Sequence, residues 1–551
     1  MTTLRTRRLA PGLGVLALFA TLAMTPATVA RQPLEDSTGS ARVAVQTRPN
    51  VLFIMVDDMR NDDLRYMPET RRLIRDQGVR FSNSFSPYPL CCPARSSVLS
   101  GLYTHNHGVY TVYEDYGFHA FDDSKTLATM LHNAGYATIY LGKYLNRYGY
   151  DPPHTETSGN SIHYVPPGWD MWRASLDGGF APTSPYFGSS TYAYTDTTLS
   201  FNGETFQSLN GRYQTTAYGE IARDIVRNRA ASDQPFLFYL SFTAPHSGWP
   251  HEADDPPPSR LDNGQTYVWQ TPARPSWVWS SMDAVVRTSP GASWHDPDFS
   301  DKPAYLRALR PLHHADLVAL LEVARQRAEA LKVVDQEVGS LMRTLADTGE
   351  LEQTLVIFTS DNGYFLGEQR MRLGKVFPHE PSLRVPLLLR GLGIPAGTTR
   401  TDPFTSIDYL STIAAATGTT PERRPDGVSL WRVARRGDAG WTRAILTETG
   451  SLGHRPRDTN QAGEPLSAGG PRDIRFLIGV RTWRYLLVDV AHQRDELYDL
   501  RRDPQEYTNL IDSPRYAEQR RLLRQALHDV RACRADSCSV TLPPRLQHHP
   551  R

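Results

Sequence analysis

The chain has 551 residues, enough for one large domain and a smaller one. Its 60 basic and 59 acidic residues give a formal net charge of +1, which argues against a nucleic-acid-binding protein with its basic stripe. Hydrophobic residues make up 40% and charged residues 22% of the chain, as in an ordinary soluble globular protein.

Residues 1–30 have the pattern of a signal peptide. Arginines at the start precede a short apolar run, Leu13–Met24, and small residues end at Ala30. The run is too short for a comfortable membrane span, so we expect cleavage, no stable membrane anchor and a secreted or extracytoplasmic protein. An uncleaved anchor is the alternative, and the Sec and twin-arginine export routes both stay open. Residues 31–49 are polar, and we expect a disordered linker there.

Apolar runs then alternate with helical patterns. Val51–Val56 is continuously apolar, which is typical of a strand buried on both faces of a parallel sheet. Similar runs follow at 137–141, 236–242, 355–359 and 385–389. Between them, 124–134 and 315–348 have the apolar spacing of amphipathic helices. The alternation predicts an α/β domain with a mostly parallel sheet over residues 50–405.

Cys91–Gly101 is the most distinctive stretch of the chain. Proline favours the first position of a helix, so we expect Pro93 to open one, with Cys91 and Cys92 at its positive end. Arg95 adds a permanently charged fork suited to an oxyanion. A nucleophile in such an anion-binding position indicates attack on a sulfate or phosphate ester. The alternative is that the two cysteines are small buried hydrophobic residues.

The later part of the chain contains a long loop and a second unit. Residues 247–303 are rich in Pro, Trp, Ser and Asp, and their tryptophans (Trp249, Trp269, Trp277, Trp279 and Trp294) favour a structured lid over disorder. Beyond Ile407 we expect a helix at 408–417, a hairpin of 476–480 with 485–488, a turn at 496–504 and a final helix at 515–531. These elements predict a smaller α+β subdomain over residues 406–551.

Cys533 and Cys538 lie near the C-terminus. In an exported protein, such a pair is expected to form a disulfide that closes a small loop. A zinc site is the weaker reading, because no further cysteine remains nearby.

Polar residues follow four of the predicted strands. They are Asp57 and Asp58, Lys143, His246, and Asp361 with Asn362. Ligands of such sheets bind beyond the carboxyl ends of the strands, so we expect these side chains at one rim. The carboxylates and the amide are hard oxygen donors, of the kind that Ca²⁺ or Mg²⁺ prefers and zinc does not.

Several of these stretches resemble the type I sulfatases. Cys91–Gly101 matches their signature C-x-P-x-R-x-x-x-L-x-G, Thr359–Gly363 resembles their second metal motif, and Glu496–Pro504 resembles a recurrent C-terminal motif. The resemblance covers nearly the whole chain from about Pro49. It implies an alkaline-phosphatase-like fold and a sulfuric ester hydrolase. It also implies that a formylglycine-generating enzyme converts Cys91 to formylglycine.

The resemblance further implies a role for individual residues. Asp57, Asp58, Asp361, Asn362 and formylglycine-91 would ligate one Ca²⁺, with Mg²⁺ as the alternative. Arg95, Lys143 and Lys375 would hold the sulfuryl oxygens, and His246 would protonate the leaving alcohol. One hydroxyl of the hydrated aldehyde would attack sulfur, and the second would expel sulfate. His105 and His107 could touch substrate, but we expect them to brace the nucleophile helix.

The chain departs from the arylsulfatase pattern at one position. Leu145 stands where many arylsulfatases have a histidine, and Gly142–Gly149 instead resembles the N-acetylglucosamine-6-sulfatases and heparan endosulfatases. We therefore expect Asn146 to bind substrate together with Lys143, His246 and Lys375. The expected substrates are sulfated sugars, such as 6-sulfo-N-acetylglucosamine, or aryl sulfates. The alternatives are a phosphomonoester or phosphonate ester hydrolase of the same superfamily and a non-catalytic binder of sulfated glycans.

Overall fold

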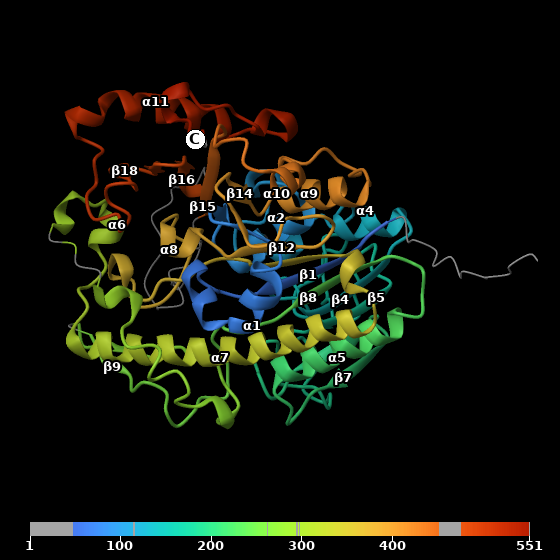
Figure 1. Cartoon of the computed structure of the whole chain (residues 1–551). Helices are drawn as coiled ribbons and strands as arrows, with labels where there is room; N and C mark the ends of the chain where they lie inside the picture. Colours follow the sequence, from blue (N-terminus) through green and yellow to red (C-terminus); the bar gives the residue numbers. More distant parts are fainter. Residues whose placement is uncertain are drawn as a thin grey trace, which may run out of the picture. The chain divides into compact units, whose positions relative to one another are not determined.

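The computed structural model describes residues 48–113, 116–261, 263–293, 296, 298–450 and 475–549 (Figure 1). The expected signal peptide, nearly all of the linker and Trp294 lie outside this range. None of the helices in the described residues is both long enough and apolar enough to cross a membrane.

A ten-stranded sheet lies at the centre of the described chain. In spatial order its strands are β13 (Thr398–Arg400), β2 (Val79–Phe81), β12 (Leu387–Arg390), β11 (Thr354–Ser360), β1 (Asn50–Val56), β8 (Phe236–Ser241), β4 (Ala137–Lys143), β5 (Met171–Ser175), β6 (Thr198–Phe201) and β7 (Thr205–Ser208). The five neighbours β11, β1, β8, β4 and β5 run parallel, whereas β12 and β6 run in the opposite direction. The predicted α/β fold is confirmed, with a mixed sheet.

The run expected as a strand at 385–389 forms β12, which pairs antiparallel with β11 in the otherwise mostly parallel sheet. The cause lies in the connection. A parallel neighbour needs a crossover back to the start of the sheet, usually through a helix. The chain between β11 and β12 contains only the short turns η9 (Glu368–Arg370) and α8 (Glu380–Leu383), so it returns from the same edge that it left.

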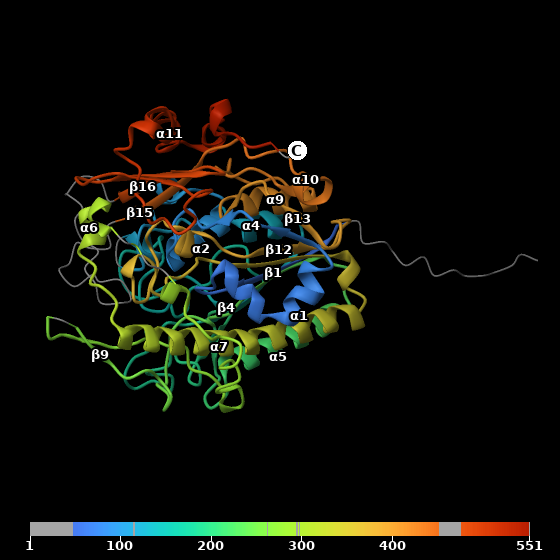
Figure 2. The same cartoon turned by 60° about the vertical axis from the view of Figure 1, so that its left-hand side comes forward.

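Helices cover both faces of this sheet. Each strand alternates its side chains between the two faces, so apolar side chains on both faces need to be covered. Val51, Phe53 and Met55 of β1 join one apolar cluster with α2 (Cys91–Ser100), α4 (Leu127–Asn133), α9 (Asp408–Thr417) and α10 (Trp431–Arg436). Leu52, Ile54 and Val56 join the other cluster with α5 (Gln214–Arg229) and α7 (His314–Asp347). Figures 1 and 2 show α5 and α7 together on the side of the sheet away from α2, α9 and α10.

The predicted helices are present with shifted ends. The pattern at 124–134 gives α4, which begins at Leu127 because Thr126 forms a capping box with Thr129. The pattern at 315–348 gives α7, an unbroken helix of 34 residues. The long loop at 247–303 contains the small hairpin of β9 (Ser259–Arg260) and β10 (Thr266–Tyr267) and packs buried Trp269 against α7.

A second sheet follows near the C-terminus. Its antiparallel strands are, in order, β15 (Ile445–Gly450), β16 (Arg475–Arg481), β17 (Tyr485–Val490) and β18 (Glu496–Asp499), and α11 (Ala517–Val530) packs on them. The predicted hairpin is β16 with β17, whereas the segment expected to be only a turn begins with strand β18. The sequence analysis did not predict β15. Cys533 and Cys538 form a disulfide in the structure.

The domain boundary expected at residue 406 stays a prediction. Both α9 and α10 pack in the core of the main sheet, and the second sheet begins only at β15. The other short α-helices and strands are α1 (Pro68–Thr70), β3 (Ser84–Phe85), α3 (Thr104–His107), α6 (Ala304–Arg307) and β14 (Phe404–Thr405), and β3 pairs with β14.

A buried polar network joins the second sheet to the main part of the chain. Glu496 of β18 accepts a hydrogen bond from Tyr305 at 2.6 Å and faces His379, whose Nε2 lies 3.1 Å from its carboxylate. Burial would lower the pKa of His379, but Glu496 outweighs it and holds that pKa above its ordinary value. Glu506 lies in the same network, 3.4 Å from the amide nitrogen of Glu380. Burial raises the pKa of Glu506 to about 8.

We expect Glu506→Gln to become progressively stabilising, relative to the wild type, as the pH rises. The folded-state pKa of Glu506, about 8, lies above the ordinary value of 4.5. Its favourable contribution is therefore complete below pH 4.5 and is lost as the pH rises through 8. Urea unfolding of both proteins across that range measures the difference in the free energy of unfolding. Glu352→Gln, at a side chain that is 93% exposed, is the surface control. A difference for Glu506→Gln that does not change with pH would contradict the prediction.

Candidate active site

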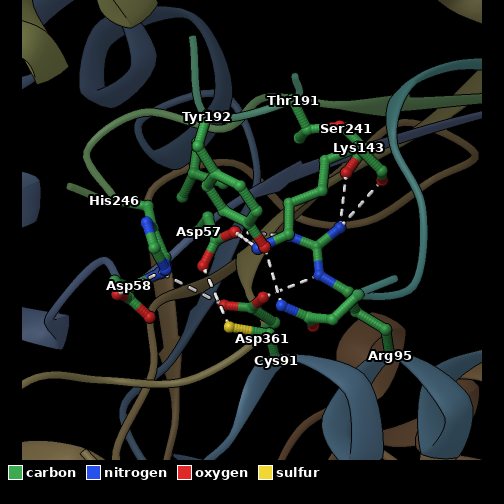
Figure 3. A network of polar contacts seen from close by, with 12 residues as sticks. Asp57, Asp58, Cys91, Arg95, Lys143, Thr191, Tyr192, Ser241, His246 and Asp361 are labelled. Carbon is green, nitrogen blue, oxygen red and sulfur yellow. Dashed lines mark hydrogen bonds and ion pairs between the residues drawn. The ribbon is translucent and has the colours of Figure 1, made fainter. Parts of the chain in front are cut away.

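The polar groups after the four predicted strands meet at one edge of the sheet. Strands β11, β1, β8 and β4 are consecutive neighbours in the sheet and parallel, so their carboxyl ends lie side by side. Asp57 and Asp58 follow β1, Asp361 follows β11, and Lys143 is the last residue of β4. His246 follows β8 after a short loop. Figure 3 shows these side chains converging on one point.

Helix α2 brings Cys91 to this point. The helix begins at Cys91 and not at Pro93 as predicted, because the carbonyl of Leu90 accepts the first helical hydrogen bond, from Ala94, at 2.9 Å. Pro93 still lies in the first turn, where backbone N–H groups have no helical partner. The Cys91 side chain is buried, with its Sγ 2.6 Å from Lys375 Nζ and 3.5 Å from an Asp57 oxygen.

Short helix α3 braces the far end of α2. The Nε2 of His107 lies 3.0 Å from the hydroxyl of Ser97 in α2. His105 lies 2.9 Å from Glu448 of β15 and 2.8 Å from the carbonyl oxygen of Cys533. The contact of His107 agrees with the expectation that it supports the nucleophile helix. His105 instead connects α3 to the C-terminal sheet, and its support of the nucleophile helix stays a prediction.

Arg95 holds the carboxylates in place. Its Nε donates to Asp361 at 2.7 Å, and its Nη1 donates to the hydroxyl of Ser241 at 2.7 Å and to the carbonyl of Lys143 at 2.9 Å. Its Nη2 lies 3.4 Å from Asp57. The guanidinium is 2% exposed, so these contacts fix the ends of β1, β4, β8 and β11 relative to one another. Contact of Arg95 with the sulfuryl oxygens stays a prediction.

The two lysines lie against the paired aspartates. Lys143 forms an ion pair with Asp57, and Lys375 forms one with Asp58. Burial would raise the pKa of Asp57, but Lys143, His246 and the other cations outweigh it and hold that pKa well below its usual range. Burial would lower the pKa of each lysine, yet the aspartates raise both above their ordinary value. Asp57, Lys143 and Lys375 are therefore charged at neutral pH.

His246, Asn146 and Tyr192 form the wall beside this cluster. His246 is held by a 2.7 Å contact between its Nδ1 and the carbonyl oxygen of Ser247, and its Nε2 lies 3.7 Å from Asp58. Burial lowers the pKa of His246 to about 4. Asn146 donates to the hydroxyl of Tyr192 at 2.7 Å. The Tyr192 ring lies 4.9 Å from the His246 ring and 4.8 Å from Lys143 Nζ (Figure 3).

The donor set fits a hard divalent cation. Asp58 Oδ2 and Asn362 Oδ1 are buried and have no hydrogen-bond partner among the described residues, although a buried oxygen normally has one. Ligand atoms of Asp57, Asp58, Cys91 and His246 lie within 4.8 Å of one another. Carboxylate and amide oxygens are the ligands that Ca²⁺ and Mg²⁺ prefer. Asp57, Asp58, Asp361 and Asn362 could therefore hold such an ion.

Three supporting residues were absent from the sequence analysis. Arg327 of α7 donates to the carbonyl oxygens of Asp58 and Pro245, and it thereby holds two strand-end loops together. Asp58 has a positive φ of 64°, a strained backbone that such contacts maintain. Ser241 and Tyr192 were missed as well. Nothing in the sequence marks Arg327, because its charge lies in an ordinary amphipathic helix.

These groups lie at the bottom of a cavity of about 740 Å³. Cys91, Asn146, Tyr192, His246 and Lys375 line it, with further residues from the loop at 247–303. The arrangement is a buried nucleophile position, surrounded by cations, that is open to a ligand from one side.

We expect the protein to bind one Ca²⁺ or Mg²⁺ per chain in isothermal titration calorimetry. Asp58→Asn should weaken binding by at least about tenfold, because it removes a charged ligand. At 100 times its dissociation constant, the ion should stabilise the wild type by about 2.7 kcal/mol. Asp255→Asn, in an acidic cluster outside the site, is the matched control. Loss of binding in the control but not in Asp58→Asn would contradict the assignment.

Comparison with known proteins agrees with the geometry. The profile of the sulfatase family matches residues 49–419. An extracellular sulfatase SULF-1 homologue of Drosophila melanogaster is 32% identical over 400 residues, which is 70% of this chain but only 31% of that protein. The human N-acetylglucosamine-6-sulfatase is 26% identical over 84% of this chain and 81% of its own length.

A solved structure also shares the fold. It contains a protein in complex with its substrate, D-glucosamine-2-N,6-O-disulfate, and it superimposes with a TM-score of 0.61 at 20% identity over 87% of this chain and 97% of that one. Since the family profile spans well over half of the residues, the chain belongs to the sulfatase family of hydrolases.

Proposed function

We propose that this protein is a sulfuric ester hydrolase that uses a formylglycine made from Cys91 and a divalent cation, Ca²⁺ or Mg²⁺. Its substrates are sulfate esters of sugars, such as 6-sulfo-N-acetylglucosamine, or aryl sulfates. The observation that carries the proposal is the position of Cys91. It lies at a helix N-terminus, buried between Lys375 and Asp57, where the four strand ends meet.

The environment of Cys91 makes its unmodified thiol a poor candidate for direct attack on the ester. Burial raises the pKa of the thiol to about 12, and Asp57 contributes in the same direction, so the thiol stays protonated at neutral pH. A protonated thiol is a poor nucleophile. Formylglycine instead supplies a hydrated aldehyde with two hydroxyl groups on one carbon, one to attack sulfur and one to release sulfate. A formylglycine-generating enzyme is the partner that this conversion requires.

Cations around Cys91 match the charge of a sulfate ester. Lys143 and Lys375 are buried and charged. Lys375 contacts Cys91 itself, and Lys143 contacts Asp57, which lies 3.5 Å from Cys91. In a buried site such groups stabilise developing charge on sulfuryl oxygens far better than they would in water. The cation held by Asp57, Asp58, Asp361 and Asn362 would supply Lewis-acid polarisation of the ester.

His246 is placed to move a proton to the leaving group. Its Nδ1 is fixed by the carbonyl of Ser247, which leaves Nε2 facing the cluster. Burial keeps the ring neutral without substrate, and the negative charge of a bound ester raises its pKa, so that Nε2 can carry the proton that the departing oxygen needs.

Three observations support an exported location. The first residues have the pattern of a signal peptide, Cys533 and Cys538 are paired, and a relative is named an extracellular sulfatase. The described helices offer no span that could cross a membrane.

Cys91→Ala should abolish the release of sulfate from 4-nitrophenyl sulfate, with a fall of at least about a thousandfold in kcat, because it removes the nucleophile. Cys92→Ala is the matched control, since its neighbouring thiol is also buried but has no role in the proposal. Mass spectrometry of the tryptic peptide Phe81–Arg95 from protein coexpressed with a formylglycine-generating enzyme should show an aldehyde at Cys91. An intact thiol in active protein would refute the mechanism, and preferential turnover of 4-nitrophenyl phosphate would favour the phosphatase alternative.

His246→Asn should slow the hydrolysis of a sugar sulfate by about 10²–10⁴-fold in kcat, which is typical for loss of a general acid. The loss should be much smaller with 4-nitrophenyl sulfate, because nitrophenolate leaves without being protonated. Steady-state kinetics with both substrates measures the two losses. Equal losses would show that His246 does not act as the proton donor.

A further inference from the structure

Aromatic side chains surround the mouth of the active-site cavity. Tyr113, Tyr150 and Trp249 all line it, and they are 53%, 48% and 46% exposed to solvent. They come from three different loops, before β4, after β4 and after β8. Aromatic rings that are about half exposed at the entrance of a site are typical of a surface that a ligand covers on binding. We call Tyr150 and Trp249 the aromatic rim.

Trp249 is exposed but its backbone is fixed. Its N–H donates to the carbonyl of Tyr192 at 2.9 Å, and its own carbonyl accepts from Tyr194 at 2.8 Å. The preceding Gly248 packs so closely that a Cβ there would lie 2.4 Å from the Tyr192 carbonyl oxygen. The exposure of the indole therefore does not come from a loose loop. A rigid backbone presents it to solvent beside Tyr192, which contacts His246 and Lys143.

Tyr150 is held in a comparable way. The Arg147 guanidinium lies over its ring, 5.1 Å from the centroid, and Asp151 fixes that guanidinium through a bidentate contact. The hydroxyl end of Tyr150 packs against Gly178, where an added Cβ would lie 2.2 Å from the tyrosine oxygen. Holding both rings in place before a ligand arrives reduces the entropy lost on binding.

The lining of the cavity also includes polar side chains. Asn146, Asp177, Ser190, Gln270 and Thr271 line it and offer hydrogen-bond donors and acceptors. Apolar faces with hydroxyls around the edge are the chemistry of a sugar ring. A cavity of about 740 Å³ also lies in the upper part of the range of about 300–1,000 Å³ that is usual for small-molecule sites.

We propose that the aromatic rim binds the face of a sugar ring next to the sulfated one, so that the protein acts on sulfated oligosaccharide chains in preference to sulfated monosaccharides. The inference rests on the proposed sulfatase function. The sulfated ring enters the cavity toward Cys91, and the neighbouring ring stacks on Trp249 and Tyr150.

The test compares kcat/KM for a heparin-derived tetrasaccharide and for 6-sulfo-N-acetylglucosamine. In the wild type, kcat/KM should be higher for the tetrasaccharide. Trp249→Ala should reduce the ratio of the two kcat/KM values by about tenfold, the loss typical of removing a well-placed aromatic contact, and Trp249→Phe should restore most of it. Tyr150→Ala should lower the ratio in the same direction.

Trp277→Ala is the matched control. Trp277 is 52% exposed and is not among the described residues that line this cavity, so both rates should stay at the wild-type level. Thermal melting of each variant shows whether it is folded. If Trp249→Ala does not fold, Trp249→Phe and Tyr150→Ala still test the proposal.

The two proposals fail differently. A wild-type protein with formylglycine that releases sulfate from none of the substrates, 4-nitrophenyl sulfate included, would overturn the proposed function. A wild-type protein that hydrolyses 4-nitrophenyl sulfate but no glycan, or whose ratio is unchanged by Trp249→Ala and Tyr150→Ala, would overturn the aromatic rim alone.

Discussion

Opposite charges buried at one edge of the main sheet are the constraint on which the site depends. Asp57, Asp58 and Asp361 are fully buried, and Arg95, Lys143 and Lys375 are at most 2% exposed. A buried charge without a partner is very costly, so each of these side chains requires the others. Their backbones belong to different strands and loops, and the charge cluster can form only if β11, β1, β8 and β4 are parallel neighbours. The charge cluster of the site therefore depends directly on the order of the strands in the sheet.

The C-terminal sheet supports the elements that carry the active-site residues. It contacts α3 through His105, which lies against Glu448 of β15 and the carbonyl oxygen of Cys533. His107 of α3 in turn contacts Ser97 in the helix that carries Cys91. On the opposite side, Glu496 of β18 contacts His379, four residues beyond Lys375. The second sheet therefore supports both the helix that carries Cys91, through α3, and the segment that carries Lys375.

The cavity combines two kinds of recognition. At its bottom, Lys143, Lys375 and a helix N-terminus favour an anion beside the carboxylates that would hold the divalent cation. At its mouth, rigid aromatic rings favour an apolar face. A sulfated sugar in a chain satisfies both, which links the proposed reaction to the proposed preference for longer substrates.

Sequence alone determined the parts of this protein that depend on residues close together in the chain. Apolar runs such as Val51–Val56 gave the central strands, the cysteine motif gave the nucleophile helix, and polar residues after each strand gave most of the site, because strand ends are a property of the chain itself. Tertiary structure decided the rest. The antiparallel direction of β12 followed from a connection without a crossover helix, and strand β15 has no distinctive pattern. Arg327, Ser241, Tyr192 and the aromatic rim acquire their roles only through contacts between segments far apart in the chain, and such contacts leave no periodic signal in the residues that make them.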